Sequence, residues 1–319
     1  MKIILTMINK FLRIAVLIAL TAFLGSCQKE FMSWLSGNVE VSLKVETGAA
    51  MTRAIADGTN IDILHYEIYG TDVERASVPL AEGSVKDSDG DGVFDLDLTL
   101  IKDQTYNFIF WAQVDREQGM EHYDVSDLRK VGIKSYADEL ANDESRAAFF
   151  AHKEIHVSGS IDETITLYRP FAQLNIGTVT YDTSLNLAGD LAVNTSEVNV
   201  TGIASVFNTI SGKGEGKQRV TFQAAVPHVD MSASERKLEV NGARYHWLGM
   251  NYMIVNGDAD NVTVDVLFDT TYGDVSLSVE NVPVRENYRT NIIGDLLTTD
   301  AKFVVVVDDR FAGADIIVE

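Results

Sequence analysis

The sequence has a single cysteine, Cys27, in 319 residues. One cysteine cannot form an intramolecular disulfide, so the fold does not depend on oxidation. Basic residues are also few, because 26 Lys and Arg stand against 47 Asp and Glu and give a formal net charge of −21. A surface of this sign repels nucleic acid and anionic lipid headgroups, which argues against both as partners.

Motifs of catalysis are missing too. No G-x-S-x-G motif occurs, and the six histidines are scattered along the chain. The glycine-rich segment 212–217 lacks the Ser or Thr that follows the lysine of a phosphate-binding loop. Because no stretch gathers a base, a nucleophile and an oxyanion donor, we expect no enzymatic activity, no catalytic residue and no cofactor of catalysis.

A long hydrophobic run is also lacking. The apolar stretch from Ile14 to Leu24 is eleven residues long and follows Lys2, Lys10 and Arg13. It is too short to span a bilayer comfortably and is typical of a secretory signal. We therefore assign residues 1–26 to a signal peptide.

This stretch ends in Leu24–Gly25–Ser26–Cys27, a sequence like a bacterial lipobox. The Cys27 thiol would accept a diacylglycerol, and further acyl chains such as palmitate would complete the anchor. Residues 27–37 would then be a lipidated tether of a surface-exposed outer-membrane lipoprotein. The alternative is a plain signal peptide with a chance cysteine.

The first element after the tether is an amphipathic stretch, residues 38–47. Val39, Val41, Leu43 and Val45 alternate with polar residues, which predicts a half-buried β-strand. A small flexible segment and then Arg53 follow, so a trypsin-like protease could detach the strand. An ordinary first strand followed by a loop is the alternative.

The remaining pattern is mostly short strands and turns. Apolar residues make up 46% of the chain, and its length suggests about two domains at roughly 100–200 residues each. Strands that recur about every eight to twelve residues, with turns between them, are typical of β-sandwiches. The one helical candidate is 135–151. A proline inside the strand-like stretch 164–177 indicates an edge or a corner, so we place the domains at 38–165 and 166–319.

Residues 87–95 have the spacing of a calcium loop. Asp87, Asp89, Asp91 and Asp95 could place oxygens around a hard cation, with Gly90 at the sharp turn. The twelfth position of an EF-hand requires Glu, and Leu98 stands there instead. The alternatives are a structural Ca²⁺ and a Gly/Asp-rich hairpin loop without an ion.

Several later segments resemble those of Bacteroidales fimbrillins, the subunits of type V pili. The segment 167–175 (LYRPFAQLN) resembles the start of their second domain, and 245–252 and 287–297 resemble later stretches. The resemblance implies two transthyretin-like β-sandwich domains in tandem.

The same resemblance implies a route of assembly and a role in adhesion. Family precursors reach the outer membrane as lipoproteins, and an Arg-specific protease removes the lipid and the first strand; here it would cut after Arg53. A donor strand from the next subunit, here within Phe303–Glu319, would fill the groove and build a head-to-tail fimbria.

Two further alternatives stay open. The chain could be a pilus anchor or tip protein that does not polymerise. It could also be a surface glycan-binding lipoprotein, in which case Trp34, Trp111 and Trp247 would have to line a sugar platform.

Overall fold

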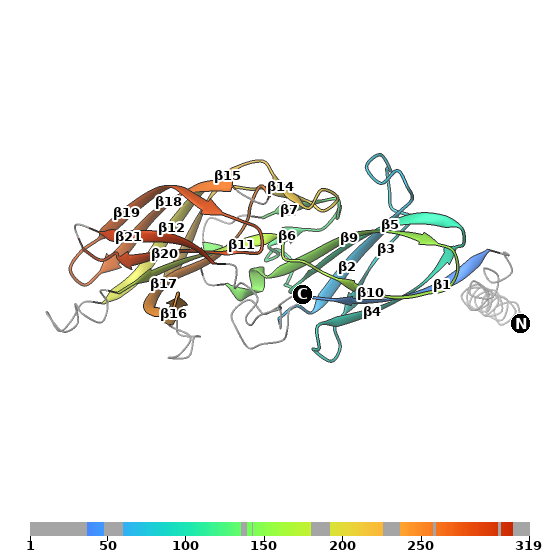
Figure 1. The fold of residues 1–319 in the computed structure, drawn as a ribbon, viewed down its shortest axis with the longest axis horizontal. Helices are drawn as coiled ribbons and strands as arrows, with labels where there is room; N and C mark the ends of the chain where they lie inside the picture. Colours follow the sequence, from blue (N-terminus) through green and yellow to red (C-terminus); the bar gives the residue numbers. More distant parts are fainter. Residues whose placement is uncertain are drawn as a thin grey trace, which may run out of the picture.

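The computed structural model describes residues 37–47, 60–134, 139–141, 143–179, 192–225, 237–257, 260–298 and 301–308. Within these ranges the regular secondary structure is almost entirely β-strand, and the helical content is one 3-10 turn, η1 (Glu144–Arg146). The larger sheets form two pairs that lie side by side along the long axis of the molecule (Figure 1). The prediction of an all-β sandwich fold is confirmed.

The first sheet pair is built from the N-terminal half of the chain. Its three-stranded sheet has the order β10-β1-β4, and its four-stranded sheet has the order β3-β2-β5-β9. Buried side chains from both sheets form one hydrophobic core. The strands are β1 (Asn38–Glu46), β2 (Ile63–Tyr69), β3 (Ala81–Lys86), β4 (Val93–Ile101), β5 (Gln104–Gln113), β9 (Ala148–Val157) and β10 (Ile161–Thr166).

The second sheet pair consists of two five-stranded sheets, with orders β16-β17-β11-β20-β21 and β19-β18-β12-β15-β8. They enclose a second hydrophobic core. The strands are β8 (Glu139–Leu140), β11 (Phe171–Thr178), β12 (Val193–Ile203), β15 (Gln218–Ala225), β16 (Lys237–Val240), β17 (Ala243–Ile254), β18 (Asp260–Thr270), β19 (Val275–Val284), β20 (Arg289–Asp295) and β21 (Lys302–Asp308).

A small four-stranded sheet, β14-β13-β7-β6, connects segments that are far apart in the sequence. β7 (Lys130–Ile133) pairs with β13 (Val206–Asn208), and β6 (Tyr123–Asp124) and β14 (Lys213–Glu215) flank them. The N-terminal and C-terminal halves of the chain therefore share a sheet.

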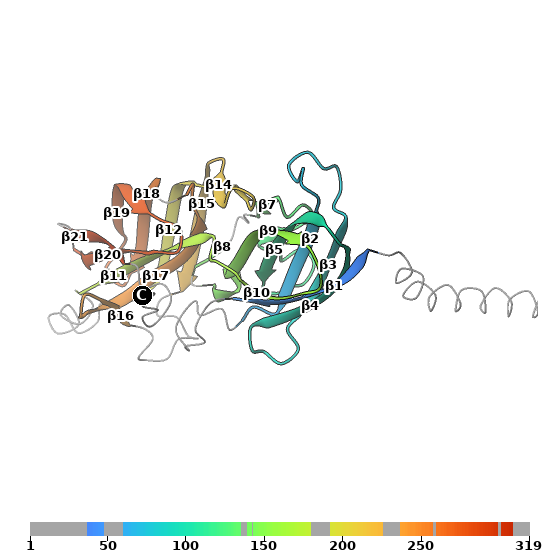
Figure 2. The same cartoon turned by 45° about the vertical axis from the view of Figure 1, so that its right-hand side comes forward.

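The chain passes between the two sheet pairs at Pro170. β10 ends four residues before it, and β11 begins at Phe171 in a different sheet, as the predicted corner requires. The Phe171 ring lies 5.0 Å from that of Tyr252, and both belong to the core of the first sheet pair. The Tyr252 hydroxyl donates a hydrogen bond to Glu144 Oε2 at 2.9 Å. Buried contacts thus join the two sheet pairs, which lie side by side in Figure 2.

The helix predicted at 135–151 is wrong wherever this stretch is described. Glu139–Leu140 is a strand, Glu144–Arg146 is the single turn η1, and β9 begins at Ala148. The ten-residue strand β9 pairs along its whole length with β5. Ladder hydrogen bonds and the burial of Phe149 and Phe150 therefore outweigh the local helix propensity.

Candidate functional site

The first strand, β1, lies inside its sheet. It pairs antiparallel with β4 along all of Asn38–Glu46 and parallel with β10 from Val41 to Glu46. β1 therefore separates β10 from β4 (Figure 1). Taking it away would open a slot with an unpaired strand edge on each side.

The apolar face of β1 points into the first core. Val41 and Val45 are fully buried and Leu43 is 1% exposed, while Val39 is half-buried against the same core. On the other face Lys44 is exposed. The alternation predicted for this strand is therefore present.

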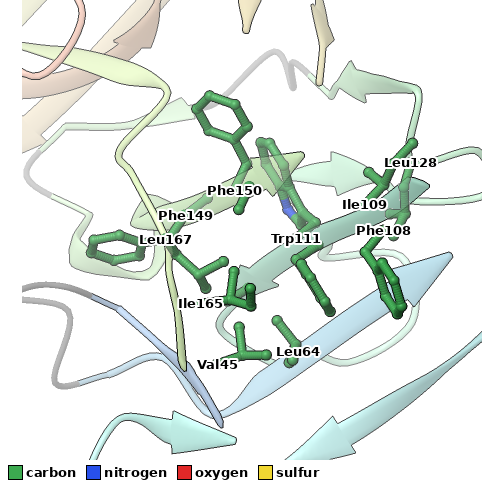
Figure 3. Close-up of a cluster of buried hydrophobic side chains, with 14 of the residues drawn as sticks. Val45, Leu64, Phe108, Ile109, Trp111, Leu128, Phe149, Phe150, Ile165 and Leu167 are labelled. Atoms are coloured by element: carbon green, nitrogen blue, oxygen red, sulfur yellow. The ribbon is translucent and has the colours of Figure 1, made fainter. Parts of the chain in front are cut away.

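The floor of the slot comes from the facing sheet, and the neighbouring strand β10 adds an apolar side chain at its edge. In Figure 3, Val45 of β1, Leu64 of β2 and Ile165 of β10 lie close together, with Trp111 above them in the view. Burying the three core side chains of β1, Val41, Leu43 and Val45, contributes about 5–9 kcal/mol at ~1.5–3 kcal/mol each. That is comparable to the whole stability of a domain, about 5–15 kcal/mol. An empty slot would therefore be costly.

The C-terminal end of β1 is fixed on both sides. The Leu167 N–H donates to the carbonyl of Glu46 at 2.8 Å, and the Thr47 N–H donates to the carbonyl of Gly92 at 3.3 Å. Leu167 leads into Arg169, whose guanidinium lies 4.8 Å from the centre of the Phe149 ring. The first strand is thus linked to the segment that joins the two sheet pairs.

The residues predicted to be processed lie outside the described residues. This applies to Cys27, to the predicted signal peptide 1–26 and to Arg53. The description stops at Thr47 and resumes at Asn60, so the predicted cleavage stays a prediction.

Part of the predicted donor segment, Phe303–Glu319, belongs to an edge strand of the second sheet pair. β21 pairs antiparallel with β20, and Phe303 and Val305 pack against the second core. Val304 and Val307 are 57% and 41% exposed. Residues 309–319 lie outside the description.

Three of the four predicted calcium ligands come together. Carboxylate oxygens of Asp87, Asp89 and Asp91 lie within 4.8 Å of one another. Asp95 is not in this group and stands on β4, opposite Lys44. The Asp87 carboxylate accepts the backbone N–H groups of Asp89, Gly90 and Gly92 at 3.2, 2.7 and 2.9 Å.

The pKa values of two carboxyl groups in this loop shift in opposite directions. Partial burial acts to raise the pKa of Asp87, but its hydrogen bonds from backbone N–H groups outweigh burial and the pKa is lowered. Repulsion from Asp91 raises the pKa of Asp89, and a cation would relieve it. The backbone hydrogen bonds to Asp87 stabilise the hairpin without a cation, and the calcium site stays a prediction.

A tryptophan platform for sugars is not available at Trp111. Its side chain is fully buried, with Nε1 donating to Gln113 Oε1 at 2.9 Å. Trp247 is half-buried against core residues, and Trp34 lies outside the described residues.

One partly buried polar cluster was not predicted from the sequence. It consists of Arg116, His122, Asp143 and Ser145. His122 Nε2 lies 2.9 Å from Ser145 Oγ and 3.1 Å from Asp143 Oδ2, and Arg116 contacts all three side chains. Burial acts to raise the pKa of Asp143, but hydrogen bonds from His122 and Ser145 outweigh it and the pKa is lowered. A catalytic triad places Ser and Asp on opposite imidazole nitrogens, whereas here both face Nε2. The cluster therefore links the segment after β5 to η1.

Among the described residues, no helix is both long and apolar enough to cross a membrane.

Comparisons with solved structures show the fold. A putative polysaccharide binding protein from Bacteroides thetaiotaomicron VPI-5482 matches with a TM-score of 0.50 and 14% identity, over 85% of this chain and 96% of that chain. The tip fimbrial protein Mfa3 from Porphyromonas gingivalis matches with a TM-score of 0.47 and 10% identity, over 85% and 99%. A fimbrial assembly protein from Parabacteroides distasonis ATCC 8503 matches with a TM-score of 0.43 and 13% identity, over 85% and 99%. The prediction of a fimbrillin-like chain is confirmed at the level of the fold.

No curated protein matches the sequence. The model of one protein family, described as a family of unknown function (DUF6562), matches residues 33–318. Because this match spans most of the chain, the protein belongs to the DUF6562 family.

Proposed function

We propose that this protein is a structural subunit of a cell-surface fimbria that assembles by strand exchange and takes part in adhesion. The observation that carries the proposal is the position of β1 between β10 and β4, with three apolar side chains buried in the core. A strand at the start of a domain that is both central and buried is the one whose loss leaves a binding slot.

Processing is the first step of the proposal. Lipidation at Cys27 would bring the precursor to the outer membrane, and an Arg-specific protease would cut after Arg53. Both sites lie in segments that flank β1, so one cut would release lipid and strand together. On this proposal the domain boundary lies near residues 165 and 166.

Refilling of the slot is the second step. An incoming strand needs apolar side chains at every second position to match Val41, Leu43 and Val45. The C-terminal stretch offers this spacing in Ala312, Ala314, Ile316 and Val318. Residues up to Asp308 already form β21 in their own sheet, so we place the donor after that strand. Head-to-tail pairing of this kind builds an open filament.

The test is digestion of the mature protein with an Arg-specific protease. We expect cleavage after Arg53, read by mass spectrometry of the new N-terminus, followed by detergent-resistant multimers. Arg53→Ala should block both steps. Arg75→Ala, at an exposed position of the loop after β2, is the matched control and should leave both unchanged.

Two outcomes separate the subunit types. If wild type and Arg53→Ala both stay monomeric after digestion, the polymerising role is contradicted. Retention of the lipid and the N-terminal strand on protein extracted from the cell surface would instead favour a pilus anchor or tip protein.

A further inference from the structure

A polar cavity of about 530 Å³ lies at the small sheet that connects the two halves of the chain. Its walls come from the loop after β2, from the turn that leads into β7, and from the end of β13 with the turn that follows it. The lining residues are Glu74, Ala76, Ser77, Asp127, Arg129, Lys130, Asn208 and Ile210. Pockets for small ligands typically measure roughly 300–1,000 Å³, so the volume suits one or two sugar rings.

Arg129 holds the three walls together. Its guanidinium forms two hydrogen bonds with Asp127, each 2.8 Å long, and Nη1 donates to the carbonyls of Val73 and Ala76 at 3.2 and 2.6 Å. The Thr209 N–H donates to the carbonyl of Arg129 at 3.2 Å. The cavity is therefore formed before any ligand arrives.

Two further side chains, Tyr69 and Glu67, hold Arg129 in position. The guanidinium lies 4.9 Å from the centre of the Tyr69 ring, and the Tyr69 hydroxyl donates to Glu67 Oε2 at 2.7 Å. The same Glu67 oxygen accepts the backbone N–H of Leu128 at 3.1 Å. Glu67 is 5% exposed, and burial raises the pKa of its carboxyl. Side chains fixed in this way hold a binding wall in place.

The charges of the lining balance. Two carboxylates and two cations line the cavity; Arg129 pairs with Asp127, and Lys130 Nζ lies 4.0 Å from Glu215 Oε2. Most of the charge in the lining is therefore already paired, which disfavours a strongly charged ligand. Six of the eight lining residues are polar or charged, which disfavours an apolar ligand.

From this geometry we propose that the cavity binds a neutral saccharide unit. Vicinal hydroxyls can donate to the carboxylates of Glu74 and Asp127 and accept from Lys130, while Ile210 offers an apolar contact to the C–H face of a ring. The site contains none of the tryptophans considered for a sugar platform. The inference does not rest on strand exchange, so either one can fail alone.

The test is ligand binding by the full-length protein. We would measure saturation-transfer NMR and calorimetry with a panel of neutral gluco-, manno-, galacto- and xylo-oligosaccharides, and with polygalacturonate as the acidic probe. We expect at least one neutral oligosaccharide to bind, and Glu74→Gln or Lys130→Met to weaken it about tenfold, the equivalent of 1.4 kcal/mol.

The matched control is Glu239→Gln, an exposed carboxylate on β16 outside the cavity, which should leave the affinity unchanged. Three results would overturn the proposal: no neutral oligosaccharide binds, binding is equal in all variants, or polygalacturonate alone binds. Circular dichroism of each variant excludes loss of fold as the cause of lost binding.

Discussion

Leu43 of β1 stands directly opposite Leu96 of β4, and the two side chains are 1% and 5% exposed. This pair lies at the centre of the strand whose removal the proposed assembly requires. Its contribution to stability can be measured directly.

Leu43→Ala should lower the free energy of unfolding by about 2–5 kcal/mol, because it leaves a cavity in a core that cannot fully close. Urea denaturation of the uncleaved protein measures this. Lys44→Ala, the next residue on the exposed face, should change the stability by less than about 0.5 kcal/mol. Equal losses in the two variants would show that β1 is not packed as described.

A peptide of residues 38–47 should compete for the vacated slot. Added in excess to the protein after cleavage at Arg53, it should reduce multimer formation, because it restores the pairing with β4 and β10. The same peptide with Val41→Asp and Leu43→Asp is the control and should have no effect, since its apolar face is lost. Native gel electrophoresis measures multimer formation. Equal inhibition by both peptides would contradict the idea that the apolar side chains of the peptide direct its insertion into the slot.

The loop at 87–92 allows the hairpin and the calcium interpretation to be separated. Asp87→Ala removes the acceptor of three backbone hydrogen bonds and should destabilise the protein by about 1 kcal/mol with or without calcium. Asp89→Asn relieves repulsion from Asp91 and should leave the calcium-free protein folded and as stable as before. If a cation binds, calcium should raise the melting temperature of wild type more than that of Asp89→Asn. An identical melting temperature in calcium and in EDTA for both proteins would leave the hairpin as the only role.

Acid should loosen the wall of the cavity through Asp127. The hydrogen bonds from Arg129 are the main cause that lowers the pKa of this carboxyl in the folded protein. A folded pKa below the unfolded value of about 3.9 means that the stabilisation is fully present above pH ~4 and is lost as the pH falls through the folded pKa. The side chain is 42% exposed, so the effect should not exceed about 1 kcal/mol.

Asp127→Asn tests this directly. The variant should be less stable than wild type at neutral pH, and the difference should shrink as the pH falls from ~4 through the lowered pKa of the folded wild-type carboxyl. Urea unfolding across this pH range measures it. A difference that stays constant down to the acid limit would show that the Asp127–Arg129 pair does not contribute.

In the sequence, the alternation of apolar and polar residues along β1 and β4 and the apolar run of β5 each predict a strand. Period two puts one face in the core, and an apolar run on both faces requires a central position, which β5 has between β2 and β9. The dipeptide Asn241–Gly242 is typical of a type I′ hairpin turn, and in the structure both residues adopt the positive φ that this turn needs, 52° and 80°.

By itself, then, the sequence determined the β-rich class, the faces of the strands and the corner at Pro170, because these follow from local periodicity and backbone sterics. Tertiary structure alone decided that β1 lies between β10 and β4, that Ala148–Ala151 is strand and not helix, and that Asp127 and Arg129 meet residues from two distant loops. The physical reason is that strand order and loop contacts depend on pairing between residues far apart in the chain, which no short window of sequence records.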